Sequence, residues 1–247
     1  MTMLENISFS AYLYDNPLLT LVLVAHFLAD FQWQSQEMAD KKASDKTFLI
    51  RHLLIVAAPL LIVFYLIPSA WLFLFLVFIS HCIIDSGKFY LSAKIADKDW
   101  DKSAFVIDQL LHYFFIAAAY SLTLPLQTPS WLFDINGGLR LLFFFVLITK
   151  PVNIVFKLFF NKYQTGNHDE QQTVAGAGAL IGLLERITMA FFLISGQYAS
   201  IGLVFTAKSI ARYDKISKSQ AFAEYYLIGS LFSIISVLMC YALLYYL

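Results

Sequence analysis

Charged residues are scarce in this sequence. Asp, Glu, Lys and Arg make up 14% of its 247 residues, compared with about 25% in an average soluble domain. Hydrophobic residues reach 60%, and the mean hydropathy is +0.69. This composition excludes an ordinary soluble domain and predicts an integral membrane protein. Basic and acidic residues balance at 17 each, so overall charge predicts no nucleic-acid partner.

Cysteine and the common catalytic motifs are also rare or missing. The two cysteines, Cys82 and Cys240, lie in apolar runs and predict small hydrophobic side chains in helices, not a disulfide framework. No HExxH, GxSxG or Walker motif occurs, so no motif specifies a reaction type. No Lys or Arg precedes the first apolar run, and we therefore expect that run to be retained as a span and not cleaved as a signal peptide.

Long apolar runs dominate what remains. A spanning helix needs about 20 mainly apolar residues, and eight segments qualify: 17–33, 48–66, 70–90, 104–123, 136–159, 177–195, 197–213 and 224–245. Asn16 and Pro17 predict the start of the first helix, with Asn16 as N-cap and Pro17 at the first helical position. The sequence therefore predicts an all-α polytopic membrane bundle, with 1–247 as a single transmembrane domain.

The basic residues predict how these spans are oriented. They fall in every second connection, which includes Lys41, Lys42, Lys46, Lys94, Lys98, Lys102, Lys157, Lys162, Lys215 and Lys218. By the positive-inside rule these connections are cytoplasmic, and both termini of an eight-span protein lie outside. Treating 177–213 as one long helix would give seven spans and place one basic cluster outside, which argues against that alternative.

Histidine and aspartate recur four residues apart inside the first four apolar segments. The pairs are His26 with Asp30, His81 with Asp85, and Asp108 with His112, and His52 is added by "IRHLLI". Residues at i and i+4 share a helix face, so each pair can direct two ligands toward one point. With the predicted orientations, all seven side chains lie at a similar depth, toward the cytoplasmic side.

The spacing of these residues also suggests an internal repeat. His26 to His81 and Asp30 to Asp85 are the same distance apart in the sequence, and His52 to Asp108 nearly so. We therefore consider a parallel repeat of two helix hairpins, 17–66 and 70–123, which would place a site at the repeat interface.

Ionisable groups inside a membrane are costly and need one another or an ion. Imidazole with carboxylate suits divalent transition metals such as Zn, Mn or Fe, and seven groups exceed the ligand number of one tetrahedral ion, so one or two ions are predicted. Asp30, Asp85 and Asp108 are the candidate catalytic bases. The alternative is that His and Asp hydrogen-bond across helices and only hold the bundle together. His168 lies in a polar segment and predicts a solvated side chain.

The second half carries candidate substrate-binding residues. With Lys88 they are Lys150, Glu185, Arg186, Lys208 and Arg212. They form either a basic wall for an anionic head group or, more simply, ion pairs and side chains that reach the membrane interface. Pro151 leaves the carbonyl four residues earlier without its helical donor. Gly178 and Gly182 have the spacing of small residues at close helix contacts.

These features together resemble a known family. The segments "HFLADFQWQ", "SHCIIDSGK", "DQLLH", "LITKPVN", "IGLLERITM", "AKSIARY" and "AEYYLIGSL" resemble bacterial inner-membrane proteins grouped as domain of unknown function 3307, over nearly the whole chain. The resemblance implies a multi-pass protein of the bacterial inner membrane. It implies no activity, because the family is defined without one.

Three functions are consistent with the sequence. A metal-dependent hydrolase would use the histidines and aspartates to activate water, and would act on a phosphorylated lipid or another anionic amphiphile from the bilayer. An ion or proton transporter would use the same groups as a relay, although the outer halves of the spans are almost wholly apolar. A scaffold or sensor would recruit a cytosolic protein through its basic loops. The hydrolase is the leading hypothesis.

Overall fold

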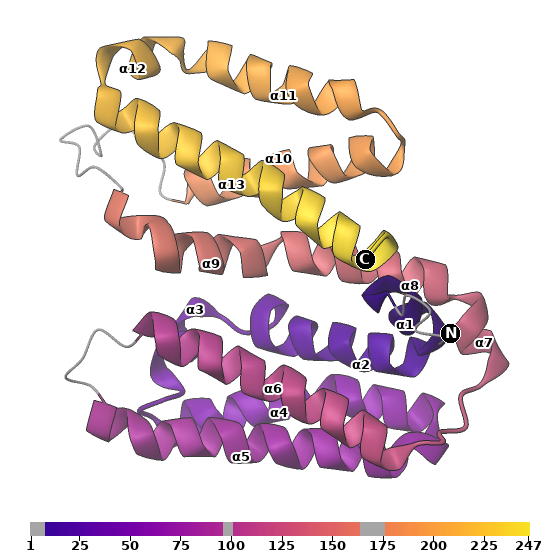
Figure 1. Ribbon diagram of the computed structural model, residues 1–247. Coiled ribbons are helices and arrows are strands. Elements are labelled where there is room, and N and C mark those ends of the chain that lie inside the picture. The colour runs from indigo at the N-terminus through magenta and orange to yellow at the C-terminus, as the bar shows by residue number, and fades with distance from the viewer. Residues whose placement is uncertain (1–7, 96–100, 164–175) are drawn as a thin grey trace, which may run out of the picture. The chain divides into compact units, whose positions relative to one another are not determined.

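A computed structural model describes residues 8–95, 101–163 and 176–247, and over these residues the chain is helical and contains no strand (Figure 1). His168 lies outside the described residues. The helices form two compact units, residues 11–143 and residues 144–247, the second of which also includes Ser8–Ser10. The prediction of one domain over 1–247, and that of a hairpin repeat, stay predictions.

The first unit is built on four long helices. Its elements are α1 (Phe9–Asp15), α2 (Pro17–Phe27), the π-helical turn η1 (Leu28–Gln32), α3 (Gln36–Lys41), α4 (Lys46–Leu66), the 3-10 turn η2 (Pro68–Ala70), α5 (Trp71–Ile95), α6 (Asp101–Thr123), α7 (Ser130–Asp134) and the start of α8 (Asn136–Ile148). Helix α5 packs against α4 and α6, and α2 packs against the same two helices. Four antiparallel neighbours thereby enclose one interior.

Local sequence signals start several of these helices. Ser35 accepts a hydrogen bond from the Met38 amide (3.2 Å) at the start of α3, and Asp45 accepts one from the Thr47 amide (2.7 Å) at the start of α4. Helix α2 begins at Pro17 with Asn16 as its N-cap residue, as predicted, but the Asn16 side chain makes no cap hydrogen bond. The Asn16 side-chain amide donates instead to the Tyr12 carbonyl (2.7 Å), and its side-chain oxygen accepts from the Tyr120 hydroxyl of α6 (2.7 Å). The oxygen that could have capped α2 is therefore bonded to another helix.

The second unit holds the rest of the chain. Its elements are the end of α8, then α9 (Lys150–Phe160), the 3-10 turn η3 (Asn161–Tyr163), α10 (Ala177–Ile194), α11 (Tyr198–Ala211), α12 (Tyr213–Lys218) and α13 (Gln220–Tyr245). Helix α10 packs against α9, α11 and α13, and α13 also packs against α9 and α12. A turn with Gly196 at φ +69° separates α10 from α11, so the single helix over 177–213 is excluded.

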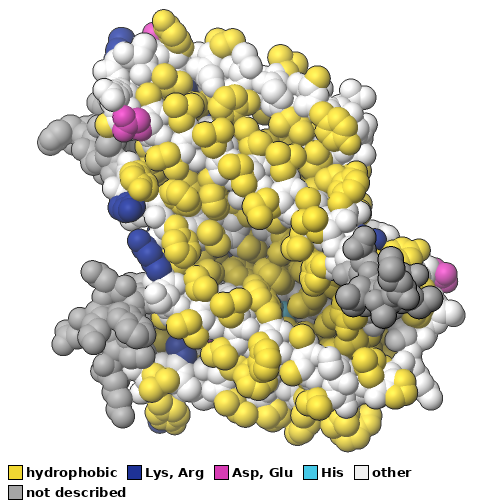
Figure 2. All heavy atoms as spheres, in the orientation of Figure 1, with side chains coloured by type: hydrophobic (Ala, Val, Ile, Leu, Met, Phe, Trp, Pro, Cys, Tyr) yellow, Lys and Arg dark blue, Asp and Glu magenta, His cyan; other side chains and the backbone are white. Residues whose placement is uncertain are grey.

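The long helices bury polar side chains and expose apolar ones. On α4, His52 is 0% exposed whereas Leu54 is 65% exposed, and on α5 His81 is 2% exposed whereas Ile83 is 66% exposed. Figure 2 shows hydrophobic side chains over most of the visible face of each unit. This is the reverse of a helix that faces water, and it is compatible with a multi-pass protein in contact with lipid.

Within the described residues, six helical segments are long and apolar enough to cross a membrane: Lys46–Leu66, Pro68–Leu91, Lys102–Thr123, Asn136–Tyr163, Ala177–Ile194 and Gln220–Tyr245. Helix α1 with the segment Pro17–Gln32 would make a seventh, bent by 104°. Helix α11 has 14 residues, or about 21 Å of rise, less than the roughly 30 Å of a bilayer core. All eight predicted segments are thus helical, and eight crossings stay a prediction.

Candidate metal centre

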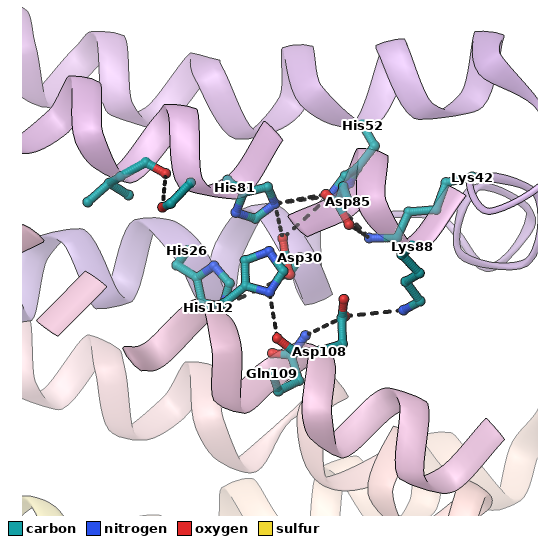
Figure 3. Close-up of polar contacts among 12 residues, drawn as sticks. His26, Asp30, Lys42, His52, His81, Asp85, Lys88, Asp108, Gln109 and His112 are labelled. Carbon is teal, nitrogen blue, oxygen red and sulfur yellow. Dashed lines mark hydrogen bonds and ion pairs between the residues drawn. The ribbon is translucent and has the colours of Figure 1, made fainter. Parts of the chain in front are cut away.

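All seven histidines and aspartates singled out from the sequence gather inside the first unit (Figure 3). Helix α2 and the turn η1 supply His26 and Asp30, α4 supplies His52, and the remaining four come from α5 and α6: His81, Asp85, Asp108 and His112. Each of the seven is at most 6% exposed. The helical rotations therefore converge on one buried cluster, which sequence spacing alone left open.

Three donor atoms form a nearly regular triangle at the centre of the cluster. His52 Nε2 lies 3.0 Å from Asp85 Oδ2 and 3.3 Å from His81 Nε2, and His81 Nε2 lies 3.1 Å from Asp85 Oδ2. Figure 3 shows the three side chains pointing toward one another. We refer to His52, His81 and Asp85 as the triad.

The edges of this triangle match those of a metal coordination shell. Metal–ligand bonds of about 2.0–2.2 Å place neighbouring ligands about 3.3–3.5 Å apart around a tetrahedral ion, and about 3.0 Å apart around an octahedral one. Two imidazoles and one carboxylate are also the ligand set of several catalytic zinc and non-haem iron sites, which leave further positions open. These buried groups can therefore hold a divalent metal ion.

Asp30 lies beside the triad, and its two carboxylate oxygens lie near different histidines. Its Oδ1 lies 3.3 Å from His81 Nε2 and 3.6 Å from His52 Nε2, whereas its Oδ2 lies 3.9 Å from His26 Nε2. The donor atoms of His26, Asp30 and His81 form a second group within 4.8 Å of one another, which shares His81 with the triad.

The backbone at Asp30 differs from the sequence prediction. His26 is the penultimate residue of α2, but Asp30 lies in the π-helical turn η1. The pair is therefore four residues apart without belonging to one uninterrupted α-helix. A π-turn is wider than an α-turn and is frequent at functional sites, and here it sets the direction in which Asp30 points.

His26, a member of the second group, and His112, whose ring stacks on it, each have a ring nitrogen without a hydrogen-bond partner. His112 Nδ1 lies 2.7 Å from the Asp108 carbonyl, which can only accept, so Nδ1 is the protonated nitrogen. Its buried Nε2 has no hydrogen-bond partner, and neither ring nitrogen of His26 has one. The two rings stack with centroids 5.2 Å apart. Buried nitrogens without a partner are uncommon in folded proteins, and a bound ion can satisfy them.

Lys42 enters the cluster from outside the four helices. It is the C-cap of α3, it is 7% exposed, and its Nζ lies 3.3 Å from Asp85 Oδ1 and 3.2 Å from His52 Nε2. Burial acts to lower the pKa of Lys42, but the carboxylates of Asp85, Asp30 and Asp108 outweigh it, and the pKa is raised above the ordinary value. The lysine is therefore held protonated.

A second lysine marks the edge of the cluster. Lys88 Nζ lies 3.2 Å from Asp108 Oδ2, and the Lys88 side chain is 33% exposed. The Gln109 amide donates to the same Oδ2 (3.4 Å), and the Tyr113 hydroxyl donates to Gln109 Oε1 (3.2 Å). Asp108, predicted as a catalytic candidate, is therefore paired with a partly exposed cation.

The family comparison covers this unit. The sequence model described as "Protein of unknown function (DUF3307)" matches residues 18–137. Residues 18–137 are therefore similar to that family. The match confirms the resemblance and contains all seven histidines and aspartates, but it ends before "LITKPVN" and the later segments, so it covers less of the chain than the sequence predicted. Neither the curated proteins nor the solved structures include a match.

Two of the candidates beyond residue 137, Glu185 and Lys208, form an ion pair. Lys208 Nζ donates to Glu185 Oε2 (2.8 Å) and to Ser230 Oγ (3.0 Å). Lys150 is exposed at the first position of α9, and Arg212 is half-buried between α11 and α12. The assignment of these residues and Lys88 to a substrate stays a prediction.

Arg186 donates hydrogen bonds to backbone carbonyls at a helix break in the second unit. Helix α8 ends at Ile148 and α9 begins at Lys150. Arg186 Nε donates to the Ile148 carbonyl (2.5 Å), and its Nη2 donates to the Thr149 carbonyl (3.4 Å) and to Asn153 Oδ1 (2.6 Å). The sequence predicted one helix over 136–159 with an unpaired carbonyl four residues before Pro151. The helix is instead broken at Thr149, and the carbonyls to which Arg186 donates are those of Ile148 and Thr149.

Neither Gly178 nor Gly182 makes the predicted close contact with another helix. A Cβ on Gly182 would lie 3.2 Å from Arg186 Nη1, and one on Gly178 would meet no atom within 4 Å. Gly182 therefore leaves room for the guanidinium on its own helix.

Sequence reasoning missed Lys42 and Gln109. Lys42 stands next to Lys41 in a basic connection, where both predict solvated side chains, and nothing in the sequence distinguishes them. Gln109 follows Asp108 on the helix, and only its position beside a buried aspartate gives it a role.

Proposed function

We propose that the protein crosses the bacterial inner membrane eight times, with both termini outside and the basic connections in the cytoplasm. The exposed apolar faces of α4 and α5 support contact with lipid. The alternation of basic and uncharged connections supports the orientation. In this arrangement α1 and α2 form one bent crossing, and α11 is a short one.

We propose further that it is a metal-dependent hydrolase whose metal ion is Zn, Mn or Fe, bound by the triad. The observation that carries this proposal is the set of separations of 3.0, 3.1 and 3.3 Å among His52 Nε2, His81 Nε2 and Asp85 Oδ2. An ion at such a site, when bound, supplies Lewis acidity and lowers the pKa of a bound water to near 7.

The chain's own residues fill the remaining roles. Asp30 is the carboxylate best placed as general base, because its Oδ1 lies 3.3 Å from one triad nitrogen and 3.6 Å from the other. Lys88 is the candidate for binding an anionic head group at the edge of the cluster, since a third of its side chain is exposed. A lipid or another anionic amphiphile suits a buried site surrounded by helices with apolar outer faces.

The test begins with metal content. The protein is purified in detergent, its metals are measured by mass spectrometry, and it is then assayed for release of phosphate from phosphorylated lipids, with and without chelator. We expect near-stoichiometric transition metal and chelator-sensitive hydrolysis. Ser80→Ala is a matched control for His81→Ala, because Ser80 lies next to His81 on α5 and bonds only to the Val77 carbonyl among the described residues.

Either half of the proposal can fail by itself. Absence of bound metal after reconstitution contradicts the metal centre. Bound metal with no hydrolysis, combined with movement of protons or metal ions across vesicles, contradicts the hydrolase and favours a transporter.

A further inference from the structure

Lys42 makes a contact that conflicts with metal binding. Its Nζ lies 3.2 Å from His52 Nε2, the nitrogen that the triad directs toward a metal ion. It also lies 3.3 Å from Asp85 Oδ1, on the triad's carboxylate. One ammonium therefore contacts two of the three triad side chains.

The contact with His52 uses a specific lone pair. A lysine ammonium has three N–H donors and no acceptor, so at 3.2 Å it can hydrogen-bond to His52 Nε2 only in the tautomer that carries the ring proton on Nδ1, which is also the tautomer that binds a metal ion through Nε2. An imidazole nitrogen has a single lone pair in the ring plane, and coordination to a metal ion uses the same pair. The ammonium and a metal ion are therefore mutually exclusive partners of this nitrogen.

Charge leads to the same conclusion. An ion bonded to His52 Nε2 at about 2.1 Å would lie no more than about 5.3 Å from Nζ at its present position. Like charges so close in a buried site repel strongly, because little water screens them. The lysine side chain must therefore move when the ion binds.

We propose that Lys42 is the resident cation of the triad, that a divalent metal ion displaces its ammonium, and that the displaced ammonium then binds an oxyanion of the phosphate type on the metal ion. The proposal rests on the metal centre proposed above and names the ligand class of that site. The four-carbon stem of lysine is flexible, so rotation of the side chain can move the charge while keeping it beside the metal ion. Metal loading would in this way create the anion-binding site.

Metal affinity tests the displacement. Zn²⁺ binding by equilibrium dialysis is compared among wild type, Lys42→Met and Lys41→Met. Lys41 is the matched control, since it is the preceding residue and its Nζ contacts the exposed Glu37 (2.7 Å). We expect Lys42→Met to bind Zn²⁺ at least about tenfold more tightly, because no ammonium competes, and Lys41→Met to match wild type. Unchanged or weaker Zn²⁺ binding by Lys42→Met would overturn the proposal.

Chemical labelling tests the same step in the unaltered protein. An amine-specific acylating reagent is applied with and without saturating Zn²⁺, and modification of Lys42 and Lys41 is quantified by mass spectrometry. Zn²⁺ should increase modification of Lys42 and leave that of Lys41 unchanged. Equal modification of Lys42 in both conditions, with Zn²⁺ bound, would refute displacement whatever the variants do. Absence of Zn²⁺ binding would instead refute the metal centre itself.

Inorganic phosphate tests the ligand class. With Zn²⁺ saturating, phosphate binding is measured by calorimetry for wild type, Lys42→Met and Lys42→Arg. We expect Lys42→Met to weaken phosphate binding about tenfold, because it removes one charge-assisted contact with the anion. Lys42→Arg keeps a positive charge and should retain most of the affinity. Equal phosphate affinity in wild type and Lys42→Met would show that Lys42 does not bind the anion.

Discussion

The two units treat their buried polar groups differently. In the first unit, His26, His112 and Asp108 each have a buried side-chain atom without a hydrogen-bond partner. Among the described residues of the second unit no such atom occurs. There the buried Arg186 donates to carbonyls at the α8–α9 break, and the half-buried Lys208 pairs with Glu185.

This difference distinguishes buried polar side chains that are satisfied by other protein groups from those that need a bound ligand. Buried polar groups are normally satisfied, and a group left unsatisfied by the protein needs another partner, such as an ion. The second unit needs none, since its polar groups complete the helix packing. In the first unit most of the unsatisfied atoms belong to the histidines and aspartates of the cluster, and others belong to Gln34 and Asn136.

The largest expected effect comes from removing a triad ligand. His81→Ala should lower metal affinity by more than about 100-fold, because His81 belongs to both possible ligand groups. Metal content after dialysis is the measurement. If Arg186→Met, in the second unit, removed the metal to the same extent, the proposed difference between the two units would be contradicted.

Removal of the metal ion by a chelator should have the second-largest effect. At a metal concentration of about 100 times the dissociation constant, bound ion stabilises the folded state by about 2.7 kcal/mol. We expect a chelator to lower the thermal midpoint of wild type in detergent and to leave that of His81→Ala unchanged. Equal shifts in both proteins would mean that the stabilising ion binds elsewhere.

Arg186→Met tests the second unit. Loss of the guanidinium removes the Arg186 donor from the Ile148 carbonyl, whereas the Thr149 carbonyl still accepts from the Asn153 amide (3.4 Å), and we expect a loss of about 2 kcal/mol in unfolding free energy. Metal content should not change. The control is Arg212→Met, which removes a half-buried arginine from the connection after α11 and should leave stability nearly unchanged.

The smallest effect concerns the Glu185–Lys208 pair. A double-mutant cycle with Glu185→Gln and Lys208→Met should give a coupling of about 0.6 kcal/mol, the average for polar pairs between membrane helices. Denaturant unfolding measures it. A much larger coupling, or a change in metal content, would show that this pair does more than hold α10 to α11.

The sequence determined the secondary structure and the identity of the metal-ligand candidates. Apolar runs of about 20 residues specify helices wherever they occur, so all eight predicted segments are helical. Charged groups inside such runs are costly enough to single out His26, Asp30, His52, His81, Asp85, Asp108 and His112 without any structure.

Tertiary structure decided how those residues meet. Spacing shows which residues share a helix face, but the rotation of each helix depends on packing against its neighbours. The triad therefore depends on the packing of α4 against α5. The π-turn that directs Asp30 and the connection that brings Lys42 onto His52 are likewise outside the reach of helical periodicity. Contacts between residues distant in sequence, which no local pattern encodes, separate Lys42 from its solvated neighbour Lys41 and assign Arg186 to the carbonyls of a broken helix.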